Sequence, residues 1–129
     1  MKKSEASRLS ALKQRQLKEW VRKLDSLLAV SKKGTVHEIK EKLFQELFKR
    51  EITSIKVSAV DSNLQARQYN YLHELFTSYF YNLLHSSFGP TNLQNMNSRE
   101  AVVFIETISK KAKNRKEKIY KEFRKDYLV

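Results

Sequence analysis

The sequence contains no cysteine, one proline and two glycines among its 129 residues. The lack of cysteine excludes disulfides, thiolate metal ligands and thiol nucleophiles, and it suits a reducing compartment. An all-β fold needs many tight turns, which draw on glycine and proline, so the scarcity of both argues against it. Lys, Leu, Glu, Gln, Ala and Arg, which favour helices, dominate instead. We therefore expect an all-α protein.

Long hydrophobic runs are absent as well. No stretch approaches the ~20 apolar residues needed to cross a bilayer. The beginning, MKKSEASRLSALKQRQ, is positively charged but never reaches the apolar region of a secretory signal peptide. We expect no membrane segment and a location in the cytoplasm, or in the nucleus if the source is eukaryotic. The length and the 40% apolar content suit a single domain over residues 1–129 with one modest core.

Positive charge, by contrast, is abundant and unevenly distributed. The formal net charge is +12. Residues 1–50 carry 14 Lys/Arg against 6 Asp/Glu, residues 109–129 carry 9 against 3, and residues 51–108 carry 3 against 5. Solubility alone gives little reason for this segregation, and crowding of like charges costs folding energy. The distribution favours two basic segments that meet a polyanion, and the alternative is an ordinary solvated surface of Lys-rich helices.

Hydrophobic periodicity predicts a basic helical hairpin in residues 1–50. Its first helix begins near Ser4 and ends at Val30, before a stop at which Gly34 can adopt the left-handed conformation common at helix ends. Thr35 and Glu38 have the spacing of a capping box for the second helix. Residues 51–60 are rich in β-branched side chains, which predicts an extended connector or a short strand.

Two further helices are expected. An aromatic core helix covers residues 61–88, capped by Asp61 or Ser62, and a basic C-terminal helix covers residues 97–127, capped by Asn97 or Ser98. The apolar surface of the aromatic helix is wide, and a chain of this size struggles to bury aromatic side chains all round, which predicts a homodimer. The expected fold is therefore an all-α bundle of about four helices that dimerises.

The densest basic stretch lies in the C-terminal helix, where five Lys/Arg occupy positions 110–116. One or two cations suffice to complement a helix dipole, so five cations suggest that these side chains bind a ligand. Side chains spread around a helix suit contacts with phosphates more than reading of base edges. Membrane-surface binding is a weaker use, because no strong apolar face adjoins these charges. The predicted nucleic-acid contacts here are Lys110, Lys111, Lys113, Arg115, Lys116 and Lys118.

A second nucleic-acid signal lies in residues 24–47. The stretch reads Leu24-x2-Leu27-Leu28-Ala29-Val30-x3-Gly34-Thr35-x2-Glu38-Ile39-x3-Leu43. It resembles the helix-extended-loop-helix of SAP-like DNA-binding modules, which read roughly L-x2-L-L-x3-G-L-x3-G-x-K-x2-L-x2-R-L. Ala29 stands where the first glycine is usual, and Val36 or His37 where a lysine is usual. The resemblance implies DNA binding in which the phosphate backbone is faced by Lys32, Lys33, Lys40 and Lys42.

Signals of catalysis are few. The three histidines, His37, His73 and His85, are too scattered for a metal pair on one helix. The spacing of Arg67 and His73 resembles that of HEPN-type helical ribonucleases, whose Arg and His face a cleft between two subunits. The position after the arginine, where those enzymes usually have a polar residue, is Gln68 in this sequence. The alternative is that both are ordinary surface residues. We expect no catalytic residues, no metal and no cofactor.

The resulting hypothesis is a non-enzymatic nucleic-acid-binding protein that contacts mainly phosphates, with DNA favoured over RNA. One alternative is a helical adapter or assembly subunit whose basic patches bind an acidic protein. A HEPN-like ribonuclease is the third interpretation.

Overall fold

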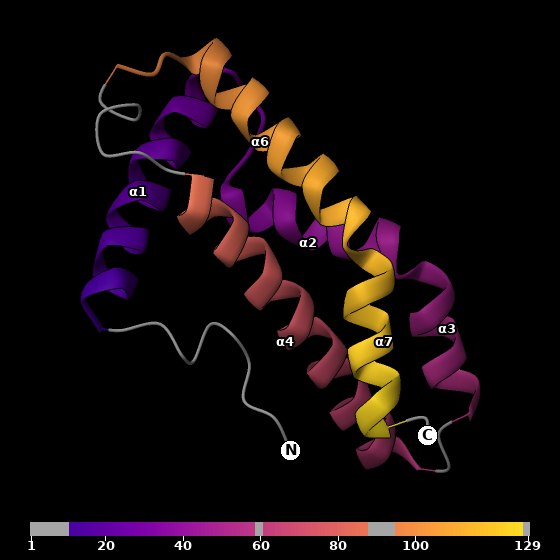
Figure 1. Ribbon diagram of the computed structural model, residues 1–129. Helices are drawn as coiled ribbons and strands as arrows, with labels where there is room; N and C mark the ends of the chain where they lie inside the picture. Colours follow the sequence, from indigo (N-terminus) through magenta and orange to yellow (C-terminus); the bar gives the residue numbers. More distant parts are fainter. Residues whose placement is uncertain (1–10, 59–60, 88–94, 128–129) are drawn as a thin grey trace.

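The computed structural model of the chain describes residues 11–58, 61–87 and 95–127. These stretches contain helices joined by short turns and no strand, so the all-α prediction is confirmed. The helices are α1 Ala11–Val30, α2 Val36–Leu47, α3 Lys49–Ser58, α4 Ser62–Ser87, α6 Ser98–Asn114 and α7 Lys116–Tyr127 (Figure 1). This part of the chain therefore holds six helices where the sequence predicted about four, because one predicted connector is helical and one predicted helix is divided.

The helical connector is α3, which follows α2 after the single residue Phe48. Ile52 and Ile55, three residues apart, are both buried on the side of α3 that packs against α4. The β-branched composition of this segment suggested a strand, but β-propensity mainly reflects how a side chain packs on its neighbours. Here the neighbours are helices, and the prediction of an extended connector or strand is wrong.

The division of the last helix falls at Arg115. Its N–H bonds to the carbonyl of Ala112 at 3.0 Å, which is the tighter i−3 pattern in place of i−4. The predicted apolar row nevertheless continues across the break, since Ile108, Ala112 and Ile119 are all buried. α6 packs against α1, α2 and α4, whereas α7 changes direction and follows α4 (Figure 1).

The predicted starts of α2, α4 and α6 are confirmed, and so is the end of α1 at Val30, whereas the start predicted near Ser4 lies outside the described residues. Thr35 and Glu38 form the complete capping box, Asp61 Oδ1 accepts from the N–H of Leu64 at 2.7 Å, and Asn97 caps α6. Just after the end of α1, Lys32 adopts the left-handed conformation, with φ 62°. In the same turn the N–H of Lys33 donates to the carbonyl of Leu28. Gly34 also has a positive φ, 91°, but it lies beyond this turn.

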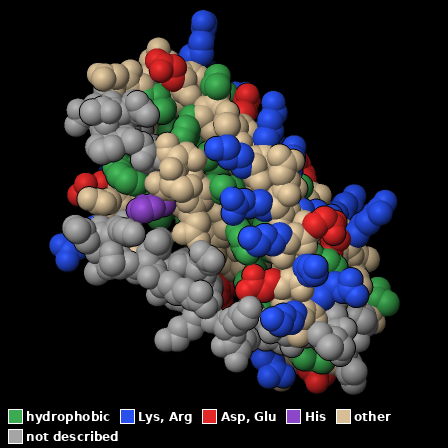
Figure 2. Space-filling model, viewed as in Figure 1, with side chains coloured by type: hydrophobic (Ala, Val, Ile, Leu, Met, Phe, Trp, Pro, Cys, Tyr) green, Lys and Arg blue, Asp and Glu red, His purple; other side chains and the backbone are tan. Residues whose placement is uncertain are grey.

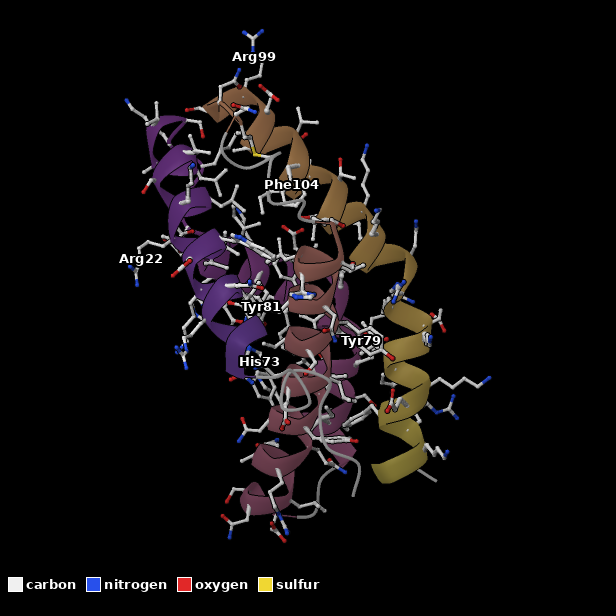
Figure 3. The ribbon with its side chains drawn as sticks, turned by 60° about the vertical axis from the view of Figure 1, so that its left-hand side comes forward. Arg22, His73, Tyr79, Tyr81, Arg99 and Phe104 are labelled. Atoms are coloured by element: carbon white, nitrogen blue, oxygen red, sulfur yellow. The ribbon has the colours of Figure 1, made fainter. Side chains whose placement is uncertain are left out.

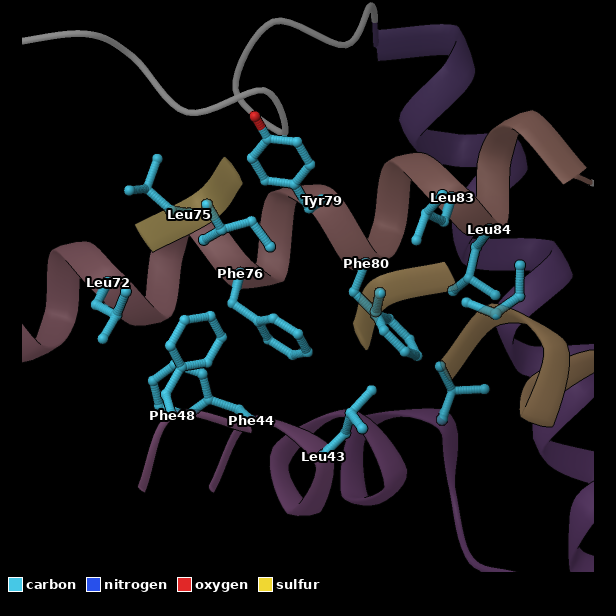
Figure 4. Close-up of a cluster of buried hydrophobic side chains, with 14 of the residues drawn as sticks. Leu43, Phe44, Phe48, Leu72, Leu75, Phe76, Tyr79, Phe80, Leu83 and Leu84 are labelled. Atoms are coloured by element: carbon cyan, nitrogen blue, oxygen red, sulfur yellow. The ribbon is translucent and has the colours of Figure 1, made fainter. Parts of the chain in front are cut away.

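The central helix is α4, which packs against α2, α3, α6 and α7. Figure 4 shows Phe76 of α4 facing Phe44 and Phe48 at the α2–α3 corner, where the Phe44 and Phe76 ring centroids are 5.5 Å apart. The buried apolar residues of α4 are Tyr71, Leu72, Leu75, Phe76, Tyr79, Phe80, Leu83 and Leu84. The wide apolar face is thus covered by the chain's own helices, so the observation behind the homodimer prediction no longer supports it.

Candidate nucleic-acid interface

A groove of about 510 Å³ joins the two basic segments of the sequence. Lys33 and Lys42 line it from the α1–α2 hairpin, and Lys110 and Lys113 line it from α6. The structure thus places four of the ten predicted contact residues around one depression, although some 70 residues separate the two pairs in sequence. All four side chains are exposed. Their ammonium groups are therefore free to meet a ligand at the rim.

The helix registers explain this convergence. On α6 the buried row Ala101, Ile105 and Ile108 fixes the core face, which leaves Lys110 and Lys113 on the flank turned toward α2. Below the lysines the groove is aliphatic, with Leu43 and Ile105 among its lining residues. The sequence alone could not indicate this arrangement, because it depends on how α6 crosses the hairpin.

Two carboxylates also line the groove. Glu46 and Glu106 each lie four residues from a groove lysine, Lys42 and Lys110 respectively, a spacing that brings side chains together on a helix. The groove therefore holds four cations against two anions, an excess of two positive charges. The groove therefore carries a net positive charge, with one carboxylate on each of its two helices, α2 and α6.

The remaining exposed cations follow the outer side of the molecule. Figure 2 shows Lys and Arg side chains gathered along α6 and α7. Of the predicted residues, those that are exposed outside the groove lining are Lys32, Lys111, Arg115 and Lys118. The prediction omitted three exposed cations of α7, which are Lys121, Arg124 and Lys125. The spacing of Lys118, Lys121 and Lys125, three and then four residues, was the available signal of a common helix face.

The prediction that Lys40 faces phosphates is wrong. Its relative exposure is 2%, and its Nζ donates to Thr77 Oγ1 at 3.1 Å and lies 3.2 Å from Glu41 Oε2. The same ammonium sits 5.4 Å from the centre of the Tyr81 ring. Lys40 is four residues from Val36 and from Phe44, both fully buried, so it shares the core face of α2. That spacing could have separated it from Lys42.

Glu41 connects Lys40 to α4. His73 Nε2 lies 2.7 and 2.8 Å from the two carboxylate oxygens of Glu41, and Figure 3 shows His73 and Tyr81 on the same side of α4. Partial burial raises the pKa of Glu41, but the hydrogen bonds and charges of His73 and Lys40 outweigh it, so the pKa lies below its ordinary value. The Tyr81 pKa is raised by burial and by the carboxylates of Asp25 and Glu41.

This polar cluster has the character of a structural clamp. Lys40 is held between the Glu41 carboxylate and the Tyr81 ring, and its Nζ donates to Thr77, so it is a poor candidate for a general base. His73, the histidine of the HEPN-like spacing, is engaged by Glu41, whereas Arg67 is exposed. Burying these bonds between α2 and α4 fixes the hairpin against the central helix, and with it the position of Lys42.

Lys116 is also partly engaged within the protein. Its Nζ lies 3.3 Å from Glu51 Oε1 and 5.7 Å from the centre of the Phe48 ring. A nearby carboxylate already offsets this charge, so a phosphate would gain less from Lys116 than from an exposed lysine. Among the ten predicted residues, Lys40 is therefore excluded as a phosphate contact and Lys116 is a weak one.

Two further features are absent from the described residues, a cluster of metal-ligating side chains and a helix that could span a membrane. In residues 11–58, 61–87 and 95–127 no three His, Asp or Glu side chains group closely enough to hold a metal ion. No helix within these ranges has the length and apolar character required to cross a bilayer. Comparisons with protein-family models, curated proteins and solved structures return no match to this chain.

Proposed function

We propose that this protein binds nucleic acid without catalysis, through phosphate contacts made around the groove between the α1–α2 hairpin and α6. The observation that carries the proposal is the convergence of Lys33, Lys42, Lys110 and Lys113 on one depression. Lysines that neutralise phosphates release condensed counterions, which supplies the sequence-independent part of nucleic-acid affinity. DNA is favoured over RNA because residues 24–47 resemble SAP-like modules.

The composition of the groove favours phosphate contacts over base stacking. Among the described residues that line it none is aromatic, and stacking of unpaired bases depends on aromatic platforms. Lysine is a flexible point charge that binds phosphate without demanding a fixed geometry. We therefore expect binding with little sequence preference.

The alternative function is an adapter that binds an acidic protein. The aliphatic floor below the lysines favours it, because an acidic amphipathic helix could place apolar side chains there. The affinity for a ligand of this kind should fall less steeply with rising salt than the affinity for a polyphosphate, because no condensed counterions are released. The two functions therefore differ in a measurable quantity.

The test is the salt dependence of binding to a random-sequence DNA duplex, followed by fluorescence anisotropy. We expect log affinity to fall linearly with log salt. The triple variant Lys42→Gln, Lys110→Gln and Lys113→Gln should flatten the slope by roughly 2–3, about 0.9 for each lost contact. An RNA duplex of the same sequence should bind more weakly than the DNA.

A matched control removes the same charge elsewhere. Lys18, Lys23 and Lys56 are exposed on α1 and α3 and do not line the groove. Their triple replacement by Gln should leave most of the slope intact. Equal effects of the two triple variants would refute the groove as the site, and no binding to either duplex at ~0.1 M salt would favour the adapter.

A further inference from the structure

We infer that the nucleic-acid surface continues from the groove along α7, where Lys118, Lys121 and Lys125 form its second half. This inference rests on the function proposed above and adds to it the length and form of the ligand. The three lysines are exposed and spaced three and four residues apart, so they share one face of α7. Of the three, only Lys118 is among the contact residues predicted from the sequence.

The opposite face of α7 is fixed by the core. Ile119 and Phe123 have 0% relative exposure, which turns the lysine row outward. Glu122 is drawn away from this row, because its Oε2 accepts a hydrogen bond from the Tyr79 hydroxyl at 3.2 Å. Figure 3 shows Tyr79 extending from α4 toward α7. Among the described side chains of α7, Glu117 is then the one exposed carboxylate, compared with three exposed lysines in the row.

The length of the combined surface sets the length of duplex that can cover it. Lys110 and Lys125 are 15 residues apart, which corresponds to ~22 Å along the helices at a rise of about 1.5 Å per residue. The bend at Arg115 shortens the direct distance, so ~22 Å is an upper limit. Base pairs stack about 3.4 Å apart along a duplex, so the surface matches about 6–7 base pairs. A rigid duplex backbone spans this distance, so the occupant that we infer is double-stranded DNA.

The experiment uses the full chain and DNA hairpins with stems of about 4, 8 and 12 base pairs. The shortest stem, ~14 Å, reaches one half of the surface, whereas the middle one, ~27 Å, reaches both. We expect at least a ~10-fold gain in affinity at ~0.1 M salt from the shortest to the middle stem, because three further phosphate contacts form. Affinity should rise little from the middle stem to the longest.

The decisive variant combines Lys118→Gln, Lys121→Gln and Lys125→Gln. It should bind the shortest stem as the unmodified protein does and lose the gain on the middle stem. The groove variant Lys42→Gln, Lys110→Gln and Lys113→Gln should weaken binding to every stem. Circular dichroism should report an unchanged helical content for both variants, because all six positions are exposed.

Two results would overturn the inference in different ways. Affinity that is independent of stem length, or an α7 variant that keeps the full gain, would refute the α7 half and leave the proposed function standing. Absence of binding to all three stems would refute the proposed function together with this inference.

Discussion

The ammonium of Lys40 lies 3.1 Å from the hydroxyl oxygen of Thr77, inside the interface of α2 and α4. Lys40 is one of four lysines that the hairpin sequence assigns to phosphates, yet it holds the protein together. Its neighbour Lys42, two residues away on the same helix, lines the groove. The two side chains are about 200° apart around the helix axis, so Lys40 lies on the core face and Lys42 on the solvent face.

We expect Lys40→Ala to destabilise the protein by about 1–3 kcal/mol, because it leaves Thr77 and Glu41 without their buried partner. Urea unfolding measures the change. Lys40→Met keeps the aliphatic stem and should cost less, since packing is retained. The slope of DNA affinity against salt should not change in Lys40→Met, and a loss of about 0.9 would mean that Lys40 does contact phosphate.

Lys32→Gly should stabilise the protein by about 0.5–1 kcal/mol. Lys32 has φ 62° at the end of α1, a left-handed conformation that glycine adopts without steric cost. Thermal unfolding by circular dichroism checks the shift in Tm. The control is Lys32→Gln, which removes the same charge and keeps the strain, so it should leave Tm nearly unchanged. Equal stabilisation by both variants would attribute the gain to charge.

Thr35→Ala should cost roughly 1 kcal/mol, because it removes the side-chain acceptor for the Glu38 N–H at the start of α2. The half-buried Trp20, which is the only tryptophan, reports unfolding through its fluorescence. Thr35→Ser retains the hydroxyl and should stay close to the original stability. An unchanged midpoint in Thr35→Ala would mean that α2 does not depend on this cap.

Glu41 should contribute stability that is lost in acid. Its pKa is lowered in the folded protein relative to the ordinary value of 4.5, so folding favours the ionised form. The contribution is therefore present above pH 4.5 and disappears as the pH falls through the lower folded pKa. Urea unfolding of the original protein and of Glu41→Gln should differ near neutral pH and converge below pH 4.5. A difference that persists unchanged at low pH would contradict the lowered pKa.

The sequence determined the helical fold, the ends of most helices and the two basic segments. These features are local: capping pairs such as Thr35 and Glu38 lie within one turn, and apolar periodicity can be read over a few residues. The buried apolar rows of α6 and α7 can be predicted from the sequence in the same way, since Ala101, Ile105, Ile108 and Ile119 repeat at helical spacing.

Tertiary packing decided what local patterns leave open. It made residues 49–58 helical, because Ile52 and Ile55 gained an apolar neighbour in α4. It covered the aromatic face of α4 from within the chain, and it separated the buried Lys40 from the exposed Lys42. Most of all, it brought Lys33 and Lys42 beside Lys110 and Lys113, since the crossing of α6 over the hairpin depends on side chains far apart in sequence.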